Sequence, residues 1–127
     1  YEIPLRLVGS EMCIRDSLES VAFHVPTITT DLAGFGLWVN SLKGRYSELK
    51  DGVKVIHRSD YNYSEVADVI KDTISEFSGL PENTIKTVRK NAADIAEKAL
   101  WKHFIKYYYE AYDVALHNAQ KRLVMNS

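Results

Sequence analysis

The side chains best placed for chemistry in this sequence follow two short β-type runs. VPTITT, from residue 25, is rich in β-branched residues and is closed by Asp31. VKVIH, from residue 53, leads into His57 and Arg58. Ligands of parallel α/β sheets bind beyond the carboxyl ends of the strands, so we expect residues 30–36 and 57–60 to share one functional edge. Arg58 also has a purely structural interpretation, as the surface partner of a nearby aspartate.

The elements expected around this edge alternate in type. A short helix with Val21, Ala22 and Phe23 on its apolar side should end at Pro26, just before the first strand. Gly34 and Gly36 suggest a loop with positive φ angles. Residues 37–50 read as one or two helical turns and a surface connection. Two strands joined by a crossover predict an α/β fold with a parallel sheet.

Three helices are expected after the second strand, over about 62–78, 81–99 and 101–121. The apolar residues at helical spacing, which predict the buried faces of the first two, are Val66, Val69, Ile70, Ile74 and Phe77, and then Ile85, Val88, Ala92, Ile95 and Ala99. Asn62 and Glu65 have the spacing of a capping box, and Gly79 ends the first of these helices. In the last helix, apolar and aromatic residues from Trp101 to Leu116 share one face, which favours a stripe that packs in a core or an interface. His103 and His117 lie apart from any cysteine or carboxylate cluster, so we predict no metal site.

The first 17 residues do not fit this pattern. YEIPLRLVGSEMCIRDS resembles an in-frame translation of a sequencing adapter, in which LVGSEMCIRDS would be the constant part. The alternatives are a genuine variable N-terminus or a secretion signal, but charged residues interrupt the apolar core that a signal requires. We therefore treat residues 1–17 as non-native, exclude them from the fold and expect them to have no fixed place in it.

Composition limits the function classes. Residues 1–17 hold two of the 16 basic and three of the 17 acidic residues, so residues 18–127 are formally neutral. A neutral domain gives no electrostatic reason to expect nucleic acid or an anionic membrane as partner. The single cysteine, Cys13, lies in the excluded segment, which agrees with a cytoplasmic protein. No apolar run approaches the ~20 residues of a membrane span.

Four segments together resemble one enzyme family. LES from residue 18, VPTITTDLAGFG from 25, VKVIHRSD from 53 and WKHFIKYYYEAYDVAL from 101 occur in the order seen in the C-terminal catalytic domain of eukaryote-like glycogen synthases, a type that also occurs in bacteria. The resemblance implies that residues 18–127 are part of the Rossmann-like, nucleotide-sugar-binding domain of a GT-B glycosyltransferase, followed by C-terminal helices. It does not extend to the arginine-rich helix with which animal and fungal relatives sense glucose 6-phosphate.

The resemblance also implies a donor site. The family transfers glucose, with retention, from a nucleotide-glucose to the non-reducing end of an α-1,4-glucan, without a metal or another cofactor. We expect UDP-glucose rather than ADP-glucose, although the sequence does not decide between them. Leu18 and Glu19 match the start of the donor-binding helix, and Glu19 would accept hydrogen bonds from the ribose hydroxyls. The alternative for Glu19 is stabilisation of the helix N-terminus. The upstream catalytic residues are missing, so the chain alone should be inactive.

Two other function classes stay open. The chain could come from a different retaining GT-B glycosyltransferase with another donor or acceptor, although the match from Trp101 onward disfavours this. It could also be a non-enzymatic α/β interaction module whose aromatic last helix docks a partner. Self-association is a further expectation, because part of the last helical stripe would be exposed.

Overall fold

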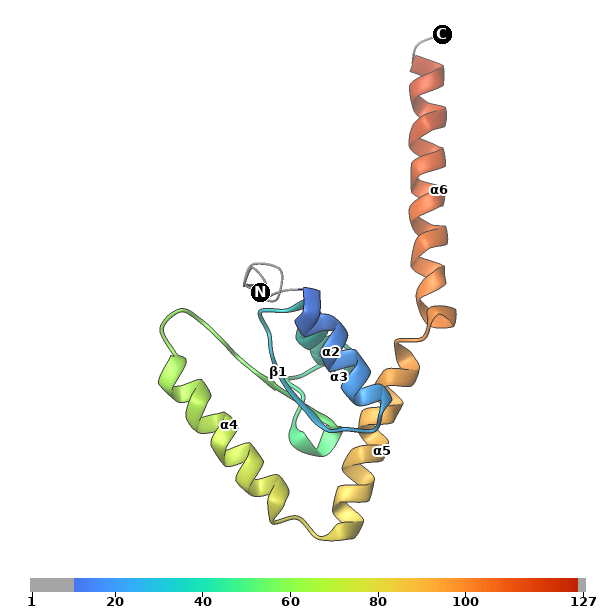
Figure 1. Cartoon of the computed structure of the whole chain (residues 1–127). Coiled ribbons are helices and arrows are strands. Elements are labelled where there is room, and N and C mark those ends of the chain that lie inside the picture. The colour runs from blue at the N-terminus through green and yellow to red at the C-terminus, as the bar shows by residue number, and fades with distance from the viewer. Residues whose placement is uncertain (1–10, 126–127) are drawn as a thin grey trace, which may run out of the picture. The chain divides into compact units, whose positions relative to one another are not determined.

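The computed structural model describes residues 11–125, with side chains from Asp16 onward. The protein is α/β and mostly helical (Figure 1). Its elements in chain order are α2 (Glu11–Ala22), β1 (Thr27–Thr30), α3 (Gly34–Lys43), the 3-10 helix η1 (Leu49–Asp51), β2 (Val53–Ile56), α4 (Tyr63–Ser78), α5 (Glu82–Lys98) and α6 (Trp101–Met125). The chain divides into two compact units, residues 1–97 and 98–127.

Helix α2 begins seven residues before the expected start at Leu18. We expected the adapter-like segment, residues 1–17, to have no fixed place in the fold. Positions 1–10 of it lie outside the described residues. Residues 11–17, in contrast, are helical and continue α2 toward its N-terminus. Glutamate, methionine and arginine favour helix, so this extension requires no native sequence. The helix ends at Ala22, and His24 then adopts a φ of 61° before Pro26.

The two strands form the predicted parallel sheet. Thr27 pairs with Val53 and Thr30 with Ile56, in register, and α3 lies on the connection between the strands. The strands are mostly β-branched, as strand propensity favours. Because the side chains of a strand alternate between faces, Val53 and Val55 point to the same face of the sheet. Both are buried on that face.

The main core lies against that face of the sheet. Val53 and Val55 meet Val21 of α2 there, and α3 and α5 supply the other apolar side chains. Leu18, Trp38 and Ala96 pack against this core while staying partly exposed. The buried residues of this cluster are Val21, Phe35, Val39, Val53, Val55, Ala92 and Ile95.

The expected loop around Gly34 and Gly36 is absent, which corrects the prediction. Helix α3 begins at Gly34, and neither glycine has a positive φ. The reason for a glycine at position 36 is close packing instead. A Cβ atom on Gly36 would lie 2.1 Å from the Thr30 carbonyl oxygen and 3.3 Å from Val55 Cγ1. Gly36 therefore lets α3 approach the backbone at the end of β1.

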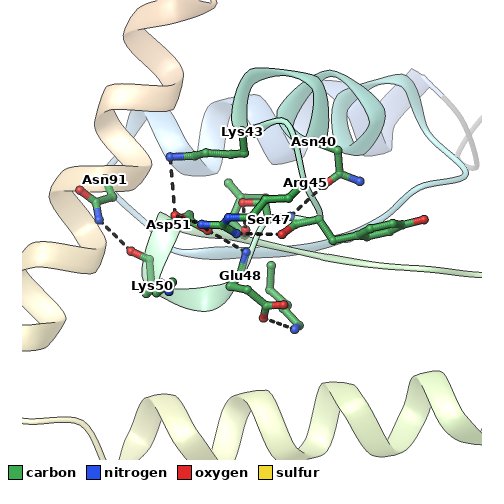
Figure 2. Close-up of polar contacts among 11 residues, drawn as sticks. Asn40, Lys43, Arg45, Ser47, Glu48, Lys50, Asp51 and Asn91 are labelled. Atoms are coloured by element: carbon green, nitrogen blue, oxygen red, sulfur yellow. Dashed lines mark hydrogen bonds and ion pairs between the residues drawn. The ribbon is translucent and has the colours of Figure 1, made fainter.

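A polar cluster anchors the amino end of β2 (Figure 2). The buried Asp51 carboxylate accepts hydrogen bonds from the Arg45 guanidinium at 2.8 Å and from the Glu48 N–H at 2.9 Å. Lys43 Nζ lies 3.7 Å from the same carboxylate. Ser47 donates to the Val53 carbonyl at 2.6 Å. These contacts hold the chain between α3 and β2 against the edge of the sheet.

Helix α5 docks beside this cluster. Asn91 donates from its side chain to the Lys50 carbonyl at 2.7 Å (Figure 2). Gly52 has a φ of 93°, and a Cβ atom there would lie 2.2 Å from the Ala92 nitrogen. Gly52 is thus required both for its backbone conformation and for the approach of α5. Arg89 adds a hydrogen bond of 3.1 Å to the His24 carbonyl.

The Asp51 cluster should make folding stability depend on pH. Burial raises the pKa of Asp51, but the Glu48 N–H, Arg45 and Lys43 outweigh it and hold the pKa below 3.8. The ionised group therefore stabilises the fold above about pH 4, and this contribution is lost as the pH falls through the lowered pKa. We expect Asp51→Asn to reduce the free energy of unfolding by about 1–2 kcal/mol at pH 7 and by much less at pH 2.

Urea unfolding followed by circular dichroism at both pH values measures this difference. Asp72→Asn, on the exposed side of α4, is the matched control and should change stability little at either pH. Equal losses for Asp51→Asn at pH 7 and pH 2 would contradict the assigned role of the carboxylate.

Helices α4 and α5 lie where the sequence predicts them, with partial agreement on their buried faces. In α5, Val88, Ala92 and Ile95 are buried as expected. In α4, Val66 is buried, but Ile74 is 57% exposed. Thr73 takes a buried position instead, because its hydroxyl donates to the Val69 carbonyl at 2.7 Å within the helix.

The second unit consists mainly of α6. Among its described residues none is buried, although the Trp101 and Tyr108 rings are in contact, tilted by 53° with centroids 4.9 Å apart. Trp101 is 58% exposed and Leu116 is 63% exposed. No core forms around this stripe within the described part of the unit, and its packing in an interface stays a prediction. Within this unit, Trp101, Tyr108, Tyr112 and Leu116 of the stripe are exposed.

Exposure of this stripe predicts self-association of the 127-residue chain. In sedimentation velocity, we expect the weight-average sedimentation coefficient to rise with protein concentration. Tyr108→Glu places a charge in the stripe and should reduce the association. His117→Glu adds the same charge about two and a half turns further along α6, on the opposite, polar side of the helix. This variant should leave the association unchanged. A monodisperse monomer at all concentrations would contradict the prediction.

Candidate functional site

The carboxyl ends of the two strands bring Asp31 and His57 together. Asp31 directly follows β1, and His57 directly follows β2. The parallel ladder continues one step further, because the Asp31 N–H donates to the Ile56 carbonyl at 3.1 Å. The structure thus places these two side chains at one edge, as expected from the strand pattern and from the general location of ligand sites in such sheets.

The Asp31 carboxylate is the centre of the hydrogen-bond network at this edge. Its Oδ2 atom accepts from His57 Nδ1 at 2.7 Å and from the Tyr46 hydroxyl at 3.0 Å. Its Oδ1 atom accepts from the Arg58 N–H at 2.9 Å. Burial raises the pKa of Asp31, but the hydrogen bonds from His57, Arg58 and Tyr46 outweigh it and lower the pKa below 3.8. Asp31 is therefore ionised at neutral pH.

The same contact changes the acidity of Tyr46. Its hydroxyl donates to the Asp31 carboxylate, which raises the pKa of Tyr46 above its ordinary value of 10.0. Tyr46 is thus a neutral hydrogen-bond donor that helps to position Asp31. No sequence pattern identifies Tyr46 as a site residue, because it lies in the connection after α3 and belongs to no periodic segment.

Arg58 and Asn62 brace the loop that follows β2. The Arg58 guanidinium donates to the Ser59 carbonyl and, at 3.2 Å, to Asn62 Oδ1. It also lies 5.6 Å from the centre of the Tyr63 ring, a cation–π contact. The expected surface pair between Arg58 and an aspartate does not form through the side chain. Only the Arg58 backbone N–H reaches Asp31.

Asn62 precedes α4 as predicted, but the expected capping box with Glu65 is wrong. Asn62 makes no side-chain cap to the helix. Its Oδ1 atom accepts from the Ser59 N–H at 2.8 Å, and its Nδ2 group donates to the His57 carbonyl at 2.9 Å. The Asn62 side chain bonds to the backbone of the turn from His57 to Asn62 instead of to the first turn of α4. Asparagine side chains commonly form such local hydrogen bonds in turns.

The geometry at His57 leaves one ring nitrogen available. Nδ1 donates to ionised Asp31, which fixes the ring orientation and the tautomer. The side chain is 65% exposed, and among the described residues the ring makes no other hydrogen bond. The opposite nitrogen, Nε2, can therefore accept a hydrogen bond from a hydroxyl group. No serine or cysteine of the described residues is bonded to it, so the pair is not part of a nucleophilic triad.

The two residues predicted to bind a nucleotide-sugar lie on α2. Leu18 is half-buried and packs against the core, whereas Glu19 is exposed. Glu19 lies in the third turn of the helix rather than at its start, because α2 begins at Glu11. The alternative role of Glu19, stabilisation of the helix N-terminus, stays open, because residues 11–17, which precede it in α2, belong to the segment treated as non-native. The exposed Glu19 carboxylate is accessible to a ligand.

Residues 11–125 contain neither a metal-binding cluster nor a membrane-spanning helix. No group of three or more histidine, cysteine, aspartate or glutamate side chains there could hold a metal ion. In the same range, no helix combines the length and the apolar character that a bilayer crossing requires. Neither a protein-family profile nor a curated protein sequence matches this chain.

Proposed function

We propose that the chain is the C-terminal part of the nucleotide-sugar-binding domain of a glycogen-synthase-type glucosyltransferase. One observation carries the proposal: the four segments beginning at Leu18, Val25, Val53 and Trp101 follow one another in the family's order over residues 18–116. The complete enzyme would transfer glucose from a nucleotide-glucose, UDP-glucose rather than ADP-glucose, to an α-1,4-glucan with retention of configuration. Residues 18–127 alone would be inactive.

The architecture supports this proposal at a coarse level. A parallel pair of strands with helices before, between and after them is the building unit of nucleotide-binding α/β domains. One of its two polar clusters, that around Asp31 and His57, lies at the carboxyl edge. This is the edge at which such domains bind their ligands.

In the proposed enzyme, α2 contributes to donor binding in two ways. Glu19 accepts hydrogen bonds from the two ribose hydroxyls, a task that suits a carboxylate because it can accept from both at once. The N-terminus of the helix faces the diphosphate with its unpaired N–H groups. The first turns of α2 here consist of residues 11–17, so the adapter-like sequence replaces the residues that would contact the diphosphate.

The exposed stripe on α6 fits this proposal and also favours a second candidate. In the GT-B arrangement the final helix crosses toward the other domain, which would cover part of the stripe. An interaction module would instead use the same aromatic face to bind a separate partner. The two candidates differ in what precedes Leu18.

The sequence upstream of Leu18 in the source gene tests the proposal. We expect a segment similar to Glu-Pro-Trp-Gly-Tyr-Thr-Pro immediately before Leu18, in place of residues 1–17. Amplification of the genomic locus with primers inside residues 18–127, followed by sequencing, measures this directly. An upstream reading frame that continues residues 1–17 unchanged, without such a segment, would reject the assignment.

A further inference from the structure

Three tyrosines with exposed rings lie near the Asp31–His57 pair: Tyr46 through its hydrogen bond to Asp31, and Tyr61 and Tyr63 shortly after His57 in the chain. Tyr46 is 49% exposed, Tyr63 is 73% exposed and Tyr61 is 98% exposed. Tyrosine is ordinarily at least partly buried, because its ring is apolar, and exposed tyrosines concentrate in binding surfaces. Tyr61 lies in the loop after β2, Tyr63 begins α4 with Asn62 between them, and Tyr46 reaches the same edge through Asp31.

Two of these rings, those of Tyr46 and Tyr63, are held by side-chain contacts, whereas Tyr61 is held through its backbone N–H, which donates to Ser59 Oγ at 3.4 Å. The Tyr46 hydroxyl is fixed on Asp31 at 3.0 Å, and the Tyr63 ring lies under the Arg58 guanidinium. Asn62, between the other two tyrosines, is bonded to both His57 and Ser59. Rings ordered before a ligand arrives lose little conformational entropy on binding, which favours affinity.

The chemistry of this edge matches a neutral sugar. A pyranose ring has apolar C–H faces that stack on aromatic rings, and a rim of hydroxyls that both donate and accept hydrogen bonds. The tyrosines supply the rings, and His57, which shares the Asp31 carboxylate with Tyr46, offers Nε2 as an available acceptor. Residues 57–65 contain Arg58 as their only lysine or arginine, together with Asp60 and Glu65. This balance disfavours a polyanion such as RNA, whose binding requires clustered basic residues.

We propose that Tyr46, Tyr61, Tyr63 and His57, here named the tyrosine edge, form a binding surface for an α-glucan chain. The inference deepens the proposed function, on which it rests for the choice of glucan over other neutral polysaccharides. It assigns the acceptor polysaccharide, rather than the nucleotide-glucose donor, to the loop after β2. Tyr61 and Tyr63 stack on successive sugar rings, and His57 Nε2 accepts a hydrogen bond from a sugar hydroxyl.

The test measures glucan binding by the 127-residue chain itself. Isothermal titration with maltoheptaose gives the dissociation constant, and co-sedimentation with glycogen gives the bound fraction. In Tyr61→Ala/Tyr63→Ala, we expect maltoheptaose to bind about tenfold or more weakly, since truncation of interface tyrosines commonly has this effect. Tyr61→Phe/Tyr63→Phe keeps the rings and should stay within about threefold of the original chain. Tyr109→Ala removes an equally large exposed ring from α6 and should leave binding unchanged.

The outcomes separate this inference from the proposed function. Loss in the double alanine variant with retention in the phenylalanine variant supports the tyrosine edge. Three results would each overturn it. The first is equal binding by the original chain and the double alanine variant, and the second is no binding of maltoheptaose and glycogen by the original chain. The third is preferential binding of a single-stranded RNA oligonucleotide. If the complete protein transfers glucose while this chain binds no glucan, the inference fails and the proposed function stands. Glucan binding without any glucose transfer would leave the tyrosine edge supported and reject the enzyme.

Discussion

Replacing Gly36 by alanine is expected to lower the free energy of unfolding by about 3 kcal/mol, a large share of the stability of a small domain. The added Cβ atom would lie 2.1 Å from the Thr30 carbonyl oxygen. No side-chain rotation relieves this clash, because Thr30 belongs to the parallel ladder with Ile56. Helix α3 would have to move away from β1, which opens the core around Phe35 and Val39.

Gly34→Ala provides the matched control for this substitution. It introduces the same methyl group two residues earlier in α3, where nothing lies within 4 Å of the new atom. Its effect should be neutral or stabilising by up to about 1 kcal/mol, because alanine reduces the entropy of the unfolded chain. Urea unfolding of both variants measures the difference. If the two variants unfold at the same urea concentration, α3 does not pack against β1 as described.

Glu19→Ala is expected to weaken donor use by the complete enzyme about 10- to 150-fold. The substitution would remove charge-assisted hydrogen bonds to the ribose, worth about 1.5–3 kcal/mol. Glu19→Gln should lose less, because its amide oxygen still accepts one hydrogen bond. Since Glu19 is exposed in the third turn of α2, neither variant should change the free energy of unfolding by more than about 0.5 kcal/mol.

Steady-state kinetics with varied nucleotide-glucose, beside a melting curve, provide the measurement. Glu76→Ala, at an exposed carboxylate of α4, is the control and should leave the donor Michaelis constant unchanged. A Glu19→Ala enzyme with a lowered melting temperature and an unaltered donor Michaelis constant would show that the assignment of Glu19 is wrong.

The secondary structure was largely predictable because local patterns determine it here. The β-branched run before Asp31 forms β1, and the two strands pair in parallel because a crossover separates them. The apolar spacing in residues 81–99 predicts both α5 and its buried residues Val88 and Ile95. Because ligand edges follow from strand direction, the proximity of residues 30–36 and 57–60 could also be predicted.

The details of the site were not predictable, because they depend on contacts between distant segments. Gly36 lies in a helix whose contact with the Thr30 carbonyl no local pattern reveals. Asn62 has the spacing of a helix cap, yet the turn from His57 engages its side chain. Tyr46 reaches Asp31 from a connection without periodicity. In each case tertiary structure, rather than intrinsic propensity, determined the outcome.

Glucose transfer by the complete protein tests the central proposal most directly. The protein is incubated with glycogen and radiolabelled UDP-glucose or ADP-glucose, and label is counted in the precipitated polysaccharide. The proposed function predicts incorporation of label that β-amylase then releases as maltose, since that enzyme cleaves α-1,4 links from non-reducing ends. A complete protein that is folded by circular dichroism but incorporates no label from either donor would contradict it.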